Sequence, residues 1–130
     1  MSSSEIYGVV FQNATATFLA RILGYDGQPV TPAQIGSIYY TVAECGDDPT
    51  EVTPVEGHDN VALTPGSVLF ATLQKDALWD RDEVGYNFRH VIDVSQASAF
   101  PTAGQHYRVE YRLMPHIGQV IVVRFRVKAI

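Results

Sequence analysis

The side chains that could do chemistry are spread thinly along this chain. It has four histidines and one cysteine, Cys45. The histidines lie in different segments, and no two of them are spaced like a metal-binding pair on one strand or helix. They are His58, His90, His106 and His116. Cys45 has no basic neighbour in the sequence that would activate its thiol, and the chain contains neither a glycine-rich phosphate loop nor a nucleophile elbow. We therefore expect a protein that is not an enzyme and has no metal or cofactor site.

Two other arrangements of polar residues stay open as alternatives. A site assembled across strands would draw on His90, Asp93 and His106, but sequence spacing alone does not bring these residues together. An acidic run offers enough carboxylate oxygens for a calcium ion, yet it lacks the alternating Asp/Asn pattern with glycine of a dedicated calcium loop. Its members are Asp76, Asp80, Asp82 and Glu83. We favour a solvated turn at this place.

A cluster of aromatic residues follows the same run and is the third candidate. Trp79, Tyr86 and Phe88 lie within one short stretch. Such side chains can plug the open end of a β-sandwich, anchor a protein partner or stack on a sugar. A core plug is the favoured interpretation for the single tryptophan of a domain this small. Stacking on a sugar, with Tyr25 as a further aromatic, would instead make the chain a carbohydrate-binding module.

The elements that must position these side chains are clearest near the C-terminus. Apolar and charged residues alternate over residues 107–113 and again over residues 123–128. A period of two is typical of an antiparallel strand that is buried on one face. Pro115 and Gly118 lie between the two runs and favour a short hairpin loop. The sequence therefore predicts two long paired strands with an apolar face and a charged face.

The charged face of this hairpin is basic, although the chain as a whole is acidic. Residues 1–106 carry 13 acidic and 4 basic residues, whereas residues 107–130 carry 5 basic residues and 1 acidic one, which together give the net charge of −5. A solvated strand face is the simplest interpretation of such a stripe. Docking on an acidic protein surface is the functional one. The predicted partner-binding residues are Arg108, Arg112, Arg124, Arg126 and Lys128.

Short β-rich segments also fill the chain before the hairpin. Turn signals such as Gly24–Pro29 separate them at intervals of about 8–12 residues, which is typical of an all-β sandwich. We expect one domain over residues 1–130, with residues 1–4 flexible and about seven strands in an antiparallel sandwich. Residues 74–79 are rich in helix formers, so we also expect one short helix or helical turn near residues 73–80.

The tract from Phe100 to Val109 resembles the corner before strand F of immunoglobulin-like (Ig-like) domains. In that corner a glycine precedes a tyrosine whose hydroxyl bonds back to the loop backbone, and a core residue follows two positions later. The matching residues here are Gly104, Tyr107 and Val109, and Val109 stands where antibody domains have a cysteine. The resemblance implies an Ig-like sandwich without the antibody-type disulfide.

The layout of the chain is also similar to small Ig-like modules in the virion proteins of tailed phages, of the baseplate, tail and decoration type. The matching stretch runs from Thr17 to Val42 and contains the turn Asp26-Gly27-Gln28-Pro29-Val30 between two strands. The terminal hairpin completes the similarity. The tract from Trp79 to His90 further resembles small proteins encoded by bacteria and phages. These resemblances imply a structural role and carry over no catalytic residue.

These observations predict a non-enzymatic structural or interaction protein, a small subunit of a phage-like particle in capsid decoration, head–tail joining or the tail. Its partners would be repeated copies of a neighbouring subunit, or copies of itself. The acidic balance argues against nucleic acid as a partner, and no stretch is apolar for long enough to cross a membrane. The N-terminal residues lack a secretory signal, so we expect synthesis in the cytoplasm and incorporation into a virion or phage-like particle.

Overall fold

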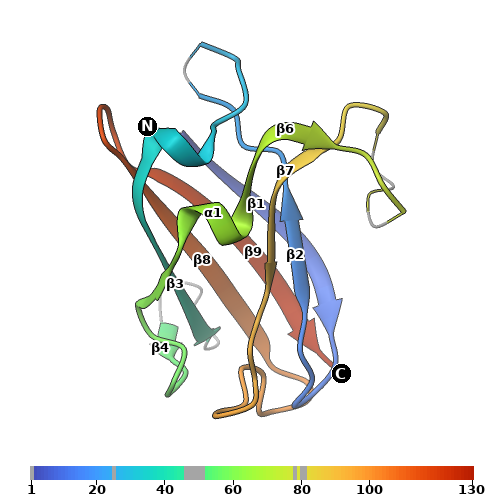
Figure 1. Ribbon diagram of the computed structural model, residues 1–130. Helices are drawn as coiled ribbons and strands as arrows, with labels where there is room; N and C mark the ends of the chain where they lie inside the picture. Colours follow the sequence, from blue (N-terminus) through green and yellow to red (C-terminus); the bar gives the residue numbers. More distant parts are fainter. Residues whose placement is uncertain (1, 25, 46–51, 78, 80–81) are drawn as a thin grey trace.

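A computed structural model describes residues 2–24, 26–45, 52–77, 79 and 82–130, with side chains from residue 9 onward. In this structure the chain is a sandwich of two β-sheets (Figure 1). The all-β sandwich predicted from the alternating sequence is therefore confirmed. The described residues contain nine strands rather than about seven, because two short edge strands line the larger sheet. Neither of the two one-turn helices among the described residues is long enough to span a bilayer.

The strands follow the chain in the order of their numbers. They are β1 (Ser2–Val10), β2 (Thr17–Ala20), β3 (Ile35–Cys45), β4 (Val52–Pro54), β5 (Val61–Leu63), β6 (Leu69–Gln74), β7 (Tyr86–Val91), β8 (His106–Pro115) and β9 (Ile121–Ala129). The helical turns are η1 (Pro32–Gln34) and α1 (Pro65–Val68). The larger sheet has the order β1-β9-β8-β3-β4, with β5 also paired to β3, and the smaller sheet has the order β2-β7-β6.

This strand order is that of an Ig-like sandwich. Strands β2, β7 and β6 occupy the places of B, E and D, and β3, β8 and β9 occupy those of C, F and G. The predicted C-terminal hairpin is present, with Val109 of β8 opposite Phe125 of β9. Strand β1 runs parallel to β9 along its whole length. It therefore covers the edge that the hairpin would otherwise expose.

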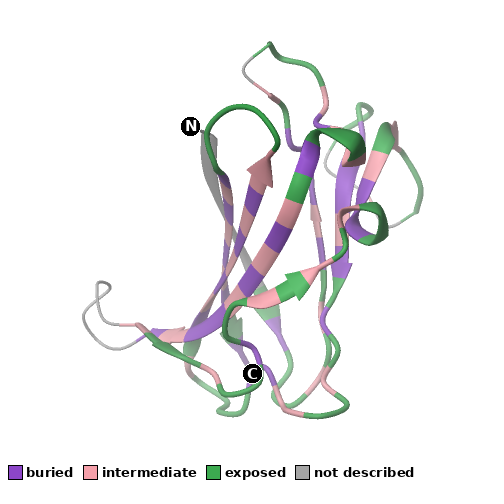
Figure 2. Cartoon of the chain, turned by 60° about the vertical axis from the view of Figure 1, so that its left-hand side comes forward, coloured by how far each residue is buried: buried purple, intermediate pink, exposed green. Residues whose placement is uncertain are grey.

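The core lies between the sheets and is built from the inward residues of each strand. Buried and less buried residues alternate along the long strands of the larger sheet (Figure 2). Phe18 of β2 packs against Phe125 of β9, with ring centroids 4.7 Å apart, and thereby joins the two sheets. Tyr111 and Phe88 meet edge to face at the same distance of 4.7 Å. Aromatic contacts of this kind add to the burial of apolar area.

The corner before β8 has the contact that the Ig-like resemblance implies. The backbone N–H of Thr102 donates a hydrogen bond of 2.9 Å to the hydroxyl of Tyr107. Gly104 has a φ of +89°, a conformation that favours glycine. Val109 is fully buried two residues after the tyrosine, and Tyr40 lies buried on β3. The loop is therefore fixed to the start of β8 by a side chain rather than by a disulfide.

One expectation about local structure differs from what is observed. The helical turns among the described residues are those at Pro32–Gln34 and Pro65–Val68, and near residues 73–80 the described chain instead continues β6 to Gln74, which pairs with Tyr86 of β7. A single turn follows, closed by the N–H of Trp79 and the carbonyl of Asp76. Pairing with β7 thus overrides the helix propensity of this segment. At the N-terminus, Ser2–Ser4 form the first part of β1 and pair with residues 121–123 of β9.

Candidate functional site

The five predicted partner-binding residues share the outer face of the larger sheet, which we call the basic face. Each alternates along β8 or β9 with residues that point into the core. They are Arg108, Arg112, Arg124, Arg126 and Lys128. Their position follows from strand geometry, since successive side chains point to opposite faces. The structure therefore brings these basic side chains, which alternate with apolar residues in the sequence, together on one surface.

Contacts within the chain divide these residues into two groups. Glu110 accepts a hydrogen bond from the Nε of Arg124 at 3.2 Å and lies 3.5 Å from a guanidinium nitrogen of Arg108. Arg112 donates to the side-chain oxygen of Asn60. Within the part of the chain that the structure describes, Arg126 and Lys128 form no ion pair. One group thus has polar partners within the chain, and the other has none in the described part of it. Arg108 combines the two, because one of its nitrogens contacts Glu110 whereas its buried Nε has no hydrogen-bond partner among the described residues.

Like charges face each other across the end of the hairpin. Arg108 lies directly opposite Arg126. Like charges in directly opposed positions of a sheet are destabilising. The chain places them there although it has more acidic than basic residues overall. Glu110, which lies beside both Arg108 and Arg124, offsets part of this repulsion, and the carboxylates of a partner would offset more.

Exposed apolar residues adjoin this end of the basic face and form what we call the apolar corner. Val9, Phe11 and Ile130 are 64%, 67% and 54% exposed. Val9 pairs with Lys128, and the N–H of Ile130 bonds to the carbonyl of Val10, so these residues lie at the same end of β1 and β9. Apolar residues beside arginine are common in the centre of protein interfaces.

The predicted aromatic cluster lies against the β6–β7 turn. Tyr86 and Phe88 are fully buried, and the Trp79 ring packs against that of Tyr86 at 5.6 Å. The Trp79 indole N–H donates to Asp82 at 3.0 Å. These positions suit the core plug and leave only part of Trp79 accessible to a sugar. Tyr25, the further aromatic considered for that role, lies outside the described residues.

The acidic run stabilises the same turn through its carboxylates. Asp82 accepts hydrogen bonds from Trp79, Arg21 and the backbone N–H groups of Val84 and Gly85. The bond from Trp79 and those from the turn hold the pKa of Asp82 far below its usual value. Asp80 lies outside the described residues, and the described part of the chain contains no group of three potential metal ligands. Asp82 thus stabilises a solvated turn through hydrogen bonds.

A cluster of two histidines and two tyrosines lies between the sheets, and sequence reasoning missed it. His58 is buried, and its Nε2 lies 2.8 Å from the carbonyl of Ala97. Since a carbonyl only accepts, Nε2 donates to it, and the Nδ1 lies 2.8 Å from the hydroxyl of Tyr40. His58 thereby joins β3 to the loop that contains Ala97. In the sequence His58 simply follows Gly57 in a loop, and no local pattern there predicts a buried histidine.

The second half of the histidine–tyrosine cluster is the pair of His90 and Tyr111. The Nδ1 of His90 lies 2.7 Å from the Tyr111 hydroxyl, and its ring packs against that of Tyr40 at 4.9 Å. Burial, and secondarily the nearby His58, lowers the pKa of His90 to about 4. Burial raises the pKa of Tyr111 well above its usual value. Both side chains are therefore uncharged at neutral pH.

The cross-strand site considered from sequence is not assembled. His90 points between the sheets, whereas His106 is exposed on the outer face of the larger sheet, opposite Lys128. Alternation along β8 turns His106 outward, because its neighbour Tyr107 points into the core. Asp93 accepts hydrogen bonds from its own loop at Ser95. Sequence order therefore does not predict which histidines meet.

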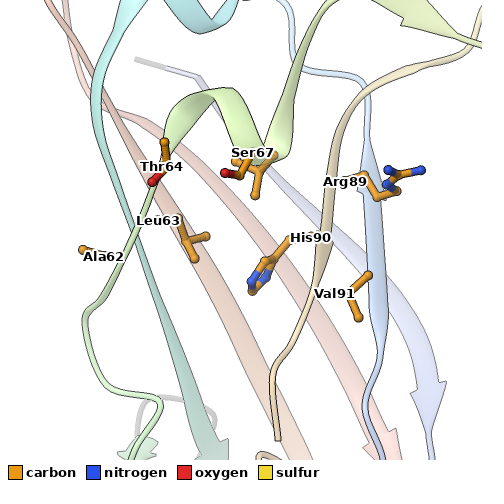
Figure 3. Close-up of a pocket in the computed structure, with 8 residues that line it drawn as sticks. Ala62, Leu63, Thr64, Ser67, Arg89, His90 and Val91 are labelled. Carbon is orange, nitrogen blue, oxygen red and sulfur yellow. The ribbon is translucent and has the colours of Figure 1, made fainter.

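A groove opens to solvent beside His90 (Figure 3). Strand β5 and α1 form one side, with Leu63 and Val68, and β7 forms the other, with Arg89, His90 and Val91. The His90 ring points into the groove, while the side chains of Arg89 and Val91 leave β7 on its other face. Arg89 lies over the Phe70 ring at 5.4 Å from its centroid. The groove thus has apolar walls, a neutral imidazole and one cation beside it.

Comparisons with models of protein families, with curated proteins and with solved structures find no match for this chain.

Proposed function

We propose that this chain is a non-enzymatic interaction protein, a small structural subunit that docks on an acidic surface of a neighbouring protein. The docking surface is the basic face together with the apolar corner. One observation carries the proposal: two cations without an ion pair among the described residues, Arg126 and Lys128, adjoin the exposed side chains of Val9, Phe11 and Ile130. Apolar contact supplies affinity at such a surface, and opposite charge supplies orientation and speed of association.

The rigid sandwich suits this role because the basic face and Val9 are part of a sheet, and Phe11 and Ile130 directly follow its strands β1 and β9. Strands β1, β9 and β8 hold its residues in fixed register. Arg108, Arg124 and Arg126 have one carboxylate among them, that of Glu110, so the remaining positive charge is favourable against the carboxylates of a partner. Such a surface requires no catalytic group.

The assembly that we propose is a phage-like particle, in which the chain would serve in capsid decoration, head–tail joining or the tail. The similarity of its layout to the Ig-like modules of tailed phages supports this step. The partner would be a repeated neighbouring subunit or a further copy of the chain. In a ring of identical subunits the basic face would meet a different, acidic surface, as head-to-tail contacts require.

The test is sedimentation of a lysate of the natural source after addition of tagged protein, with mass spectrometry of each fraction. We expect the wild-type protein to travel with a large particle. The double variant Arg126→Glu, Lys128→Glu should stay near the top of the gradient. Lys75→Glu is the matched control, since it reverses the charge of an exposed residue beyond the end of β6 in the other sheet.

Two results would contradict the proposal. One is a wild-type protein that remains at the size of a monomer and brings no other protein with it. The other is a double variant that sediments with the particle as the wild type does. Circular dichroism of each variant establishes beforehand that the sandwich is folded.

A further inference from the structure

We propose that the groove between β5 and β7 binds an extended peptide segment of a protein partner, which adds to the free edge of β7 as a further strand. The segment would place an apolar side chain into the groove and an acidic side chain beside Arg89. This surface is separate from the basic face, and the inference does not depend on the function proposed above.

The edge of β7 is open along its last residues. Strand β6 pairs with β7 at two positions, Leu69 with Phe88 and Gln74 with Tyr86. After Phe88, the pairing recorded for β7 is with β2 alone, up to Val91. Across the groove, β5 pairs with β3 on one side, and its other side is an edge. Two strand edges, one from each sheet, therefore flank the same groove.

The backbone of β7 points in the right direction to receive a strand. The N–H of Ile92 bonds to the carbonyl of Ala16, on the side of β2. Backbone groups of successive residues point to opposite edges of a strand, so the N–H and C=O of Val91 point toward the groove. Val91 is also 52% exposed. Addition of a strand to such an edge derives its affinity from main-chain hydrogen bonds.

The side chains of the groove select what an added strand would present inward. Leu63 and Val68 form apolar walls, and the His90 ring lies beside them (Figure 3). Its Nδ1 is taken by Tyr111, and no contact of the other ring nitrogen is recorded among the described residues. The groove is open to solvent and has a volume of about 470 Å³. A strand residue opposite His90 would point inward and bury an apolar side chain there.

Charge selects what the strand would present outward. Arg89 is the one cationic side chain among the groove residues, and none of them is acidic. Because Arg89 points away from the groove, its cross-strand neighbour on an added strand would share its face. The low pKa of His90 keeps the imidazole neutral at pH 7, so it adds no charge. The groove thus fits an extended segment in which apolar and acidic residues alternate.

The experiment uses two fluorescein-labelled peptides, one in which valine alternates with glutamate and a control in which valine alternates with lysine. Fluorescence anisotropy measures binding to the full chain. We expect the glutamate peptide to bind and the lysine peptide to bind at least about tenfold more weakly. Arg89→Glu should reverse this preference. Arg126→Glu, which makes the same charge change on the basic face, should leave the affinity for the glutamate peptide within about twofold.

Amide shifts in ¹H–¹⁵N spectra locate the bound peptide. We expect the largest shifts at Val91, at Asp93 and in β5. Shifts confined to Arg126 and Lys128 would place the peptide on the basic face and overturn the inference, while leaving the proposed function intact. Binding of neither peptide to the folded protein would also overturn it. A third result would also overturn the inference: the chain binds neither peptide but self-associates, and Arg89→Glu abolishes this self-association. The groove would then bind a second copy of the chain rather than a peptide segment of a partner.

Discussion

The two faces of β8 are made by the same strand and have opposite properties. The inward residues Tyr107, Val109 and Tyr111 are fully buried. The outward residues Arg108 and Glu110, which lie between them in sequence, remain partly exposed. Each inward side chain has fixed neighbours in the core. The outward ones include a cation directly opposite another cation.

This difference indicates which face the fold depends on. The inward residues of β8 all suit a buried position, which is what a stable fold requires. The outward face retains a like-charge pair, Arg108 and Arg126, an arrangement that is unfavourable in a sheet in general. Residues that break a local rule in this way are expected at functional sites. The following predictions test the contrast between the two faces, beginning with the largest expected effect.

Truncation of an inward aromatic residue should cost the most. Tyr111→Ala removes ring contacts to Phe18, Phe88 and Phe125 and leaves the Nδ1 of His90 without its partner. We expect the free energy of unfolding to fall by about 4 kcal/mol. Urea denaturation followed by tryptophan fluorescence measures it.

The matched variant on the outward face is Arg112→Ala, one residue further along β8. It removes the contact to Asn60, and we expect a loss below about 1 kcal/mol. Equal losses in the two variants would show that the faces do not differ as proposed.

Asn87 extends the contrast to a polar residue inside the core. Its side chain is fully buried, accepts from the N–H of Ile22 at 2.7 Å, and donates to the carbonyls of Ile22 and Val30 at 2.9 Å each. Asn87→Ala leaves these backbone groups unpaired in the interior. We expect a loss of about 3 kcal/mol in urea denaturation.

Gln96→Ala is the control for this variant, because it shortens an exposed amide side chain. A loss at Asn87 no larger than at Gln96 would mean that water replaces the three hydrogen bonds.

The pair of His90 and Tyr111 makes the inward face sensitive to acid. In the folded chain the pKa of His90 is about 4, below its usual value of 6.5. Unfolded chains therefore bind a proton between these values where the folded chain does not. The contribution is fully present above pH 6.5 and is lost as the pH falls toward 4. Because the ring lies at an open groove, we expect a loss of about 2 kcal/mol.

Chemical denaturation at a series of pH values measures this effect. In His90→Gln the stability should vary less between pH 6.5 and 4 than in the wild type. His58, which lies near His90, and Asp93 are unchanged in this variant, so whatever they contribute is common to both curves. Parallel curves for the two proteins would assign the acid sensitivity to another group.

Tyr107→Phe tests the corner at the start of β8 with a smaller change. It removes the hydroxyl that accepts from the N–H of Thr102 and keeps the buried ring. We expect a loss of about 1 kcal/mol, the usual net value of one hydrogen bond. Thermal denaturation of the variant measures it. An unchanged melting temperature would show that water satisfies the Thr102 N–H equally well.

The sequence predicts the parts of this structure that depend on local patterns. The hairpin of β8 and β9 and the common face of the basic residues follow from a period of two, and the corner at Gly104 and Tyr107 follows from the local resemblance to Ig-like domains. These features need no knowledge of distant neighbours. The function proposed from them remains a prediction.

The parts that sequence reasoning missed depend on pairing between distant segments. His58 meets Tyr40 across 18 residues, and Asn87 meets Ile22 across 65. The helix expected near residues 73–80 is displaced by the pairing of Gln74 with Tyr86. The groove exists because β6 leaves β7 after Phe88, which no local pattern shows. In each case tertiary contacts decide between conformations that local propensity leaves open.

The smallest predicted effect is the most specific to the outward face, because its sign depends on the opposite residue. Arg126→Glu places a carboxylate opposite Arg108, whereas Arg124→Glu places one opposite Glu110. We expect the first variant to gain, and the second to lose, about 0.5 kcal/mol of unfolding free energy. Both differences should shrink in high salt, which screens exposed charges. If Arg126→Glu also lost stability, the pair of Arg108 and Arg126 would be part of the fold rather than a surface held for a partner.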